Sequence, residues 1–363
     1  MFRLAVQQQF AQQQQHIMKY QMLSRLADVG LSAFCFRQIV FCCFLCSVFI
    51  VLLLNRPSSL NDDVSIDWPP SRTTTALVDA KIQQLERQKL LHEKCRDLKK
   101  LAKANQHQRR KVGATQVRFI IEDRHRVVYC DVPKVASTNL KRLMIILSGK
   151  VETDDLSSIS QSAVHEKKEI RELYAKNLND TIKKGLGDFT KFIFVRHPFE
   201  RLVSAYRDRL VNNEIYQKTV GKEIVLKYRQ NPNQLSLETG HDVTFPEFVR
   251  FVVDEWKDAK RHLDVHWRPV VDLCHPCDMK FHFIGKFETL NQDVDLLLDK
   301  LNETDLSRLF AGQPNKPKTT SSLWKESMKM ISHQQLSDLN QMFADDFRLF
   351  GYPHYYTKRK SLR

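Results

Sequence analysis

The hydrophobic and polar positions of the chain follow two patterns, one typical of strands and one of helices. Short runs rich in β-branched and aromatic residues predict buried strands at 117–121, 127–132, 192–195 and 281–284. Apolar residues at helical spacing predict helices at 140–147, 198–210, 245–256, 291–301 and 333–350. A charged stretch predicts a further helix at 166–178. Strands that alternate with helices indicate an α/β domain, 117–363, around a central, largely parallel sheet.

An uncharged apolar run, QIVFCCFLCSVFIVLLL at 38–54, predicts a membrane-spanning signal-anchor, because it is about the shortest length that crosses a bilayer. A signal peptide is the alternative, but a long polar tail precedes the run and no small-residue cleavage site follows it. Basic residues precede it and Asp62, Asp63 and Asp67 follow it, which predicts a cytoplasmic tail at 1–37. A short span with many aromatic residues suits an early-secretory membrane. We expect a single-pass type II Golgi membrane protein with a luminal domain.

The segment 55–116 predicts a luminal stem. It contains a linker-like Pro69-Pro70 pair and then a charged helical pattern at 76–104. The apolar stripe of this helix is patchy and consists of Val78, Ile82, Leu85, Leu98 and Leu101. Because Lys89 and His92 interrupt the heptads, two interpretations stay open: a coiled-coil stalk that forms a homodimer, and a solvated single helix.

The 363 residues carry a net charge of +15 and have an isoelectric point of about 9.4. A strongly positive chain indicates an anionic partner, such as nucleic acid, a membrane surface or an acidic polysaccharide. The chain contains no RNA-recognition, zinc-finger or KH signature, so we expect no nucleic acid partner.

Four cysteines follow the apolar run, Cys95, Cys130, Cys274 and Cys277. In an oxidising lumen they are disulfide candidates with three pairings, and a single CxxC is a weak zinc signal. Two Asn-x-Thr sequons, at Asn179 and Asn302, would be glycosylation candidates in the same compartment.

The stretch RVVYCDVPKVASTNLKRLMIIL, 126–147, predicts a strand, a tight loop and a helix. Pro133 ends the strand, and Ser137, Thr138 and Asn139 are good residues for a helix N-terminus. Free N–H groups and the positive end of the helix dipole make such a loop an anion cradle, to which Lys134 adds a charge. The loop is P-loop-like in position only. The GxxxxGK[ST] pattern is missing, which argues against an ATP or GTP hydrolase.

The stretch FIFVRHPFERLVSAYRDRL, 192–210, repeats this arrangement. Arg196 stands where the strand ends, Pro198 suits a first helical turn, and Arg201 and Ser204 follow on the helix. Ligands of open α/β sheets bind at the carboxyl ends of strands, so two such sites indicate a ligand with two phosphate-like ends.

These two stretches, "VPKVASTNLKRL" and "FVRHPFERLVSAY", resemble the two signatures of the Golgi carbohydrate sulfotransferases. They are most similar to the group that contains the chondroitin 4-O-sulfotransferases and the HNK-1 sulfotransferase. The segments 271–293 and 339–352 also fit this group, and the resemblance spans roughly 119–352. It is weak at 151–188 and 211–264, the segments that face the acceptor.

The resemblance implies a single sulfotransferase domain that uses the donor 3′-phosphoadenosine 5′-phosphosulfate (PAPS). It assigns the 5′-phosphosulfate to the first motif, that is Pro133, Lys134, Val135, Ala136, Ser137, Thr138 and Asn139. It assigns the 3′-phosphate to Arg196 and Ser204 of the second motif. Arg201 is open between a place beside this phosphate and an ion pair with Glu200 or Asp208.

Lys134 is the expected catalytic residue, because its ammonium would stabilise the leaving phosphate. His165 lies between the motifs, where heparan-type sulfotransferases carry their general base, and we favour it over His197, Glu152 and Asp155. No metal is required, since lysine and arginine supply the positive charge.

The expected reaction is sulfation of a glycosaminoglycan, at the 4-hydroxyl of N-acetylgalactosamine in chondroitin or dermatan. Sulfation of terminal glucuronate or of N-acetylgalactosamine on N-glycans is the alternative within the class. A membrane-anchored polyanion-binding protein without activity would explain the charge but not the paired cradles.

Overall fold

The computed structural model describes the residues 74–104, 117–165, 171–175, 186–258, 263–311 and 318–355. They all belong to one compact unit, Ser71–Arg363. The predicted tail 1–37 and the predicted membrane span 38–54 lie outside the described residues. Within the described ranges, no helix combines the length and the apolar character that a membrane crossing needs.

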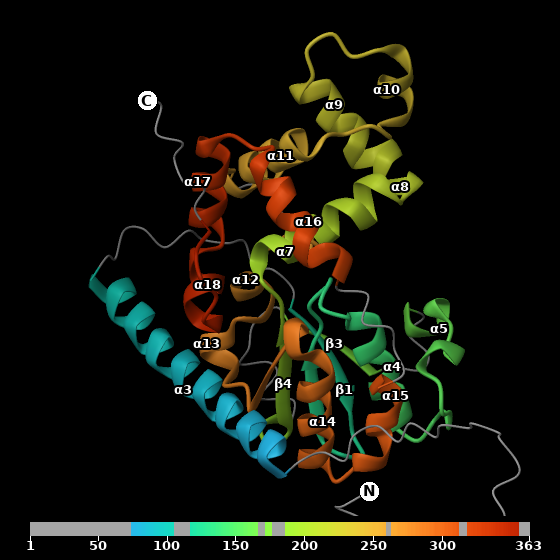
Figure 1. Ribbon diagram of the computed structural model, residues 1–363, viewed down its shortest axis with the longest axis vertical. Coiled ribbons are helices and arrows are strands. Elements are labelled where there is room, and N and C mark those ends of the chain that lie inside the picture. Colours follow the sequence, from blue (N-terminus) through green and yellow to red (C-terminus); the bar gives the residue numbers. More distant parts are fainter. Residues whose placement is uncertain are drawn as a thin grey trace, which may run out of the picture. The chain divides into compact units, whose positions relative to one another are not determined.

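A five-stranded sheet forms the centre of this unit, in the order β3-β1-β2-β4-β5 (Figure 1). The strands are β1 Val117–Glu122, β2 Val127–Cys130, β3 Arg171–Ala175, β4 Thr190–Val195 and β5 Phe283–Lys286. The neighbours β2, β4 and β5 run parallel, whereas β1 is antiparallel to both β2 and β3. The sheet is therefore mixed, and the prediction of a largely parallel sheet was wrong for half of its pairings. A turn of four residues joins β1 to β2, which is too short for a parallel crossover.

The strand β3 lies within the segment that was predicted to be a charged helix, 166–178. In register with β1, Leu173 stands opposite Phe119, and Glu172 forms an ion pair with Arg118. The local sequence suits a helix, but the open edge of β1 offers it a row of backbone partners. Pairing with a distant strand has here overridden local propensity.

Helices cover the sheet and extend from one of its ends. They include α4 Ser137–Leu147, α7 Pro198–Tyr206 with its π-helical continuation η3 Arg207–Val211, α14 Leu290–Leu301 and α18 Ala344–Phe350. A second apolar cluster joins α7 to α9 Lys222–Tyr228, α11 Phe245–Lys257, α16 Lys318–Lys329 and α17 His333–Met342. These helices gather at the end of the sheet where β4 leads into α7 (Figure 1).

The remaining elements are short. They are η1 Leu156–Ser158, α5 Gln161–His165, α8 Glu214–Tyr216, η4 Gln217–Gly221, α10 Gln234–Thr239, α12 Val270–Cys274, α13 Pro276–Met279, η5 Phe287–Thr289, η6 Thr304–Ser307 and α15 Arg308–Ala311.

The helix α3, Thr74–Ala104, packs along the domain against β5, α14 and α18 (Figure 1). The side chains that it buries are Ala80, Gln84, Leu91 and Cys95. Of the predicted stripe, Val78, Ile82, Leu85 and Leu101 are about half exposed or more, whereas Leu98 is partly buried against the core. Neither a free stalk nor a solvated helix describes this segment, because the buried positions form a different stripe, which packs against the rest of the domain.

Polar side chains of α3 also cover the open edge of β5. Arg87 donates a hydrogen bond to the Ile284 carbonyl oxygen at 3.1 Å and pairs with the buried Asp293 at 2.8 Å. Gln88 donates to the carbonyl oxygen of His282. An edge strand exposes unpaired backbone groups, and α3 satisfies them from the side. The helix thus completes the sheet.

Two disulfides join distant parts of the chain, Cys95 to Cys277 and Cys130 to Cys274. The structure thereby has one of the three pairings open from the sequence, in which the two cysteines of the CxxC go to different partners. The first bond ties α3 to α13, and the second ties β2 to α12. No group of three or more histidine, cysteine and acidic side chains in the described part of the chain could hold a metal ion.

Candidate active site

The loop between β2 and α4 is a sharp turn without glycine. Lys134 and Ala136 both have left-handed backbones, with φ of 72° and 65°. Such a conformation costs a residue with a side chain about 1 kcal/mol or more, so the surroundings must hold it. Val132 and Val135 supply part of this hold, because both are fully buried. The two valines therefore anchor the loop in the core, whereas residues 136–139 are half-buried and partly accessible to solvent.

The N-terminus of α4 faces this loop with unused N–H groups. The first helical bond runs from the Leu140 amide to the Ala136 carbonyl oxygen at 3.1 Å, and no side chain caps the helix at Ala136. The amides of Ser137, Thr138 and Asn139 precede that bond and so have no partner within the helix. These three N–H groups and the positive helix end form the cradle for an anion that the sequence predicts.

Arg201 supports the same loop from the interior. Its guanidinium donates to three backbone carbonyl oxygens, of Pro133 at 3.0 Å, of Arg268 at 2.8 Å and of Val265 at 3.0 Å. Its side chain is almost fully buried, and this burial lowers the pKa of Arg201 to about 10. Among the described contacts, Arg201 forms no ion pair with Glu200 or Asp208, and its place beside the 3′-phosphate stays a prediction. Arg201 is a positioning residue that ties α7 to the loop.

Arg196 stands at the carboxyl end of β4, as the sequence predicts, and connects the two motifs. It donates to the Lys134 carbonyl oxygen at 3.2 Å, lies 3.5 Å from Glu200, and stacks over the ring of Phe287 at 4.0 Å. Burial lowers the pKa of Arg196, and Glu200 opposes this shift. Ser204 follows on α7, one turn after Glu200, and is half-buried.

The ammonium of Lys134 forms an ion pair with Asp208, 3.0 Å from Nζ to Oδ2. The Lys134 side chain is only 18 % exposed, and burial lowers its pKa although Asp208 acts in the opposite direction. Asp208 belongs to the π-helical turn η3. Turns of this kind are frequent at functional sites, because the extra residue changes the direction of the side chains. Here the turn brings a carboxylate to Lys134.

The pair of Lys134 and Asp208 continues into a polar chain that the sequence reasoning missed. Asp208 also contacts Arg209 at 3.2 Å, and Arg209 Nη2 lies 2.6 Å from Nε2 of His266. The other ring nitrogen of His266, Nδ1, lies 2.6 Å from Asp264. Since the guanidinium only donates, Nε2 of His266 accepts and Nδ1–H donates to Asp264.

Asp264, at the far end of this polar network, receives a further hydrogen bond. Tyr216 donates its hydroxyl to Asp264 at 2.9 Å. Burial alone would raise the pKa of Asp264, but the hydrogen bonds from His266 and Tyr216 bring it below the ordinary value. An acidic residue two positions before a histidine, next to Trp267, was the only signal in the sequence. It lies at the edge of the segment 211–264, in which the family resemblance is weak.

A third cation at the same edge was also missed. Lys286 ends β5 and stands opposite Val195 of β4 in register. Burial lowers its pKa, and its ammonium lies 4.2 Å from the centre of the Tyr352 ring. The three parallel strands β2, β4 and β5 therefore each lead to one cation, Lys134, Arg196 and Lys286. This is the edge at which open α/β sheets bind their ligands.

The other predicted residues are placed as follows. His165 ends α5, and its side chain lies outside the described residues, as does Asn179. Asn302 is exposed at the left-handed C-terminal residue of α14. His197, the rival base, packs its ring against Trp324 at 4.7 Å and Phe347 at 5.6 Å. Burial lowers the pKa of His197 to about 4, so this histidine is a neutral part of an aromatic cluster.

Comparison with known proteins adds the following. A family model described as the sulfotransferase family matches residues 117–353. Carbohydrate sulfotransferase 11 of Mus musculus is 34% identical over 241 residues, 65% of this chain and 68% of that protein. Carbohydrate sulfotransferase 9 of Homo sapiens is 32% identical over 273 residues, 74% of this chain and 60% of that protein. Carbohydrate sulfotransferase 12 of Xenopus laevis is 35% identical over 254 residues, 65% and 60% of the two chains. No solved structure matches the chain.

Proposed function

Because the chain belongs to the sulfotransferase family, we propose that this enzyme transfers the sulfuryl group of PAPS to the 4-hydroxyl of N-acetylgalactosamine in chondroitin or dermatan. Its relatives' names support a carbohydrate acceptor. The observation that carries the proposal is the cradle: three amides at the N-terminus of α4 beside Lys134, on the edge that also presents Arg196 and Lys286.

Different residues of the protein bind the two ends of the donor. The amides and side chains of Ser137, Thr138 and Asn139 bind the 5′-phosphosulfate, and Pro133, Val135 and Ala136 shape the loop around it. Arg196 and Ser204 bind the 3′-phosphate. Lys286, one strand further along this edge, adds positive charge there. Charge-assisted hydrogen bonds from these groups would orient both ends of the donor.

Lys134 acts on the bond that breaks. As the S–O bond to the phosphate lengthens, negative charge grows on the phosphate oxygen, and the ammonium stabilises it. The acceptor oxygen forms the new S–O bond, and its proton passes to a base. For this to occur, Lys134 exchanges Asp208 for the donor's phosphosulfate, so the carboxylate holds the ammonium in place between turnovers.

Two histidines are candidates for the base. The family resemblance favours His165. The geometry favours His266, because Asp264 fixes its tautomer and leaves Nε2 as an acceptor, which now receives an N–H from Arg209. Three contacts, through Arg209 and Asp208, connect this ring to the Lys134 ammonium. A carboxylate that orients a histidine in this way also stabilises the imidazolium formed when the ring takes a proton.

The acceptor and the location are inferred from the chain as a whole. The net charge of +15 suits an acidic glycosaminoglycan. The apolar run 38–54 and the charges around it suit a type II Golgi membrane protein, with the domain in the lumen. A homodimer through the stem would need the outward face of α3, Val78, Ile82 and Leu85, since the other face is buried in the domain.

The test uses the fragment 74–363, secreted from a eukaryotic cell. It is incubated with radiolabelled PAPS and desulfated chondroitin, dermatan, heparosan or glucuronate-capped glycans, beside Lys134→Ala and the exposed control Lys329→Ala. Label in chondroitin or dermatan, lost about 10²–10³-fold in Lys134→Ala only, is the expected result. Label in the glucuronate-capped glycan alone would reject the acceptor but keep the donor. A fragment that binds neither PAPS nor 3′-phosphoadenosine 5′-phosphate would reject the proposal.

A further inference from the structure

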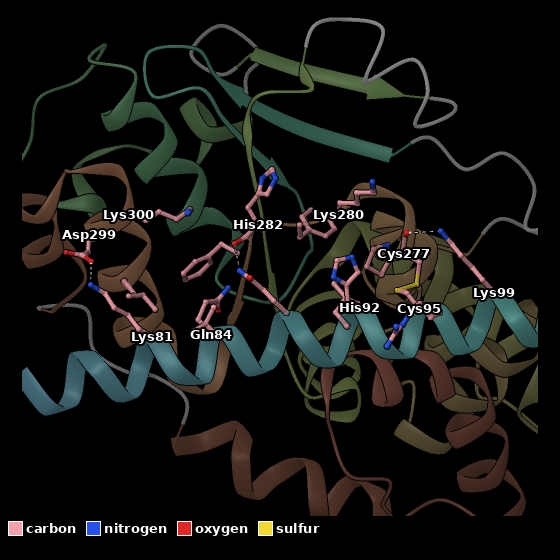
Figure 2. A pocket seen from close by; sticks show the side chains of 18 residues that line it. Lys81, Gln84, His92, Cys95, Lys99, Cys277, Lys280, His282, Asp299 and Lys300 are labelled. Atoms are coloured by element: carbon pink, nitrogen blue, oxygen red, sulfur yellow. Dashed lines mark hydrogen bonds and ion pairs between the residues drawn. A yellow bond between two sulfur atoms is a disulfide. The ribbon is translucent and has the colours of Figure 1, made fainter.

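A cavity of about 990 Å³ lies between α3 and the residues that lead into β5 (Figure 2). Its walls come from α3, from the segment 276–283 that leads into β5, and from α14. Figure 2 shows Lys81, Gln84, His92 and Lys99 reaching from α3, with Lys280, His282 and Lys300 on the other side. Cavities of this size are typical of ligand sites.

This cavity is separate from the donor site. Phe283, which lines it, begins β5, whereas Lys286, which belongs to the cradle edge, ends it. Because β5 runs parallel to β4 and β2, the amino end of β5 lies at the opposite edge of the sheet from Lys134 and Arg196. The cavity therefore takes no part in holding PAPS.

The charges around the cavity are strongly unbalanced. Its cationic side chains are Lys81, Arg96, Lys99, Lys280 and Lys300, and its acidic one is Asp299. Lys81 pairs with Asp299 at 3.0 Å, and Lys99 pairs with Asp278 at 3.5 Å. Within the described ranges, no carboxylate lies in ion-pair distance of Arg96, Lys280 or Lys300. This rim presents positive charge that no carboxylate of the described residues neutralises.

The floor is apolar and the walls are fixed. Leu91, Phe281, Phe283 and Leu296 line the interior and are nearly or fully buried. The disulfide of Cys95 and Cys277 lies in the wall and ties α3 to the segment before β5. Arg87 fixes α3 to Asp293 close by. Side chains that are held in place before a ligand arrives lose little freedom when it binds.

We propose that this cavity is a second binding site for the acidic glycan, which it holds at a part of the chain remote from the reacting sugar. The inference rests on the proposed function for the identity of the glycan. Carboxylates or sulfates of the polysaccharide would pair with Arg96, Lys280 and Lys300, and the apolar faces of its sugar rings would cover the floor. A glycan bound at both sites reaches the donor at a raised effective concentration, so long acceptors are preferred over short ones.

The test compares two triple variants that each remove three positive charges. Arg96→Gln, Lys280→Gln and Lys300→Gln change the cavity rim. Lys227→Gln, Arg308→Gln and Lys329→Gln are the matched control, at exposed positions elsewhere. We expect the rim variant to bind polymeric chondroitin sulfate about tenfold more weakly at low salt, since three exposed contacts contribute a factor of about two each. Its KM for the polymeric acceptor should rise by the same factor. Its kcat, its KM for a tetrasaccharide and its KM for PAPS should stay unchanged.

Binding is measured by calorimetry without PAPS, so the result does not depend on transfer. Equal loss in both variants would reduce the effect to net charge and overturn the proposal. Wild-type affinity of the rim variant, while the enzyme still sulfates chondroitin, would also overturn it and leave the proposed function intact. Vesicles containing phosphatidylserine form a further arm. Selective loss of vesicle binding, with glycan binding retained, would replace the glycan by an anionic lipid.

Discussion

Nζ of Lys134 lies 3.0 Å from Oδ2 of Asp208, which joins the loop after β2 to the π-helical turn after α7. The ammonium is therefore already paired with an internal carboxylate before any substrate binds. An anionic donor has to displace this carboxylate, which also contacts Arg209 at 3.2 Å.

Asp208→Asn is expected to tighten binding of 3′-phosphoadenosine 5′-phosphosulfate, because the ligand no longer competes with a carboxylate for Lys134. The gain is about three- to fivefold, since Asp208 is partly exposed and its charge is screened. Calorimetry measures it, with Glu214→Gln on α8 as the control. Weaker binding by Asp208→Asn would mean that the carboxylate positions the lysine for the donor and does not compete with it.

Arg201→Met is expected to destabilise the domain by about 3 kcal/mol or more. It leaves the carbonyl oxygens of Pro133, Val265 and Arg268 without their charged donor. Thermal unfolding is the measurement, and Arg207→Met, which is exposed on the next turn, should change the Tm little. If Arg201→Met kept the wild-type Tm and lost only nucleotide affinity, Arg201 would be a ligand contact, the role first considered from the sequence.

The pH profile of kcat/KM distinguishes the two candidate bases. If His266 takes the acceptor proton, His266→Gln lowers kcat by about 10²–10⁴-fold and removes the acidic limb of the profile. Asp264→Asn should lower kcat less, because His266 stays in place and loses only the carboxylate that fixes its tautomer. His165→Gln is the matched variant, and an acidic limb lost in His165→Gln but retained in His266→Gln would assign the base to His165.

His197 makes stability depend on pH. Its pKa is about 4 in the folded protein and about 6.5 in the unfolded chain. Below pH 6.5 the unfolded chain takes up a proton that the folded domain refuses, so this contribution to stability is full above pH 6.5 and is lost as the pH falls to 4. The loss amounts to about 3 kcal/mol. In denaturant titrations, His197→Gln should show a smaller difference between pH 7 and pH 4.5 than the wild type. An unchanged difference would exclude His197 as its source.

A fragment that begins at 117, where the matched family segment begins, should be much less stable than one that begins at 74. Without α3 the domain loses the disulfide of Cys95 with Cys277 and the ion pair of Arg87 with Asp293. It also loses the side chains that cover the edge of β5. Secreted yield and Tm of the two fragments test this. Arg87→Leu within the longer fragment isolates one contact and should cost about 3 kcal/mol, because the buried Asp293 loses its charged partner and keeps only the Lys286 amide and the Thr289 hydroxyl. Equal Tm of both fragments would refute the prediction.

The sequence was informative where short-range rules apply. Pro133, the N-terminal residues of α4 and the basic residue at the end of β4 define the strand, loop and helix that the structure shows. The family motifs lie on the same residues. The sequence also indicated the carboxyl edge of the sheet as the ligand site, since both motifs follow strands.

The parts of the fold and of the site that were not predicted from the sequence depend on contacts between distant residues. Nothing local shows that Asp264 meets His266 beside Arg209, or that β3 adds to β1 in place of a helix. The face of α3 was misjudged for the same reason. Gln84 and Arg87 look like solvated positions until β5 supplies backbone partners, and a helix that buries polar side chains escapes a search for apolar stripes.

The disulfide between Cys95 and Cys277 has a mechanical consequence. A mechanical force applied to α3 from its N-terminal side is transmitted to the domain by this disulfide and by the ion pair of Arg87 and Asp293. The force therefore does not have to pass through the segment 105–116. A protease that cuts within that segment would leave α3 covalently attached, and the enzyme would stay in one piece until a reductant opens the bond.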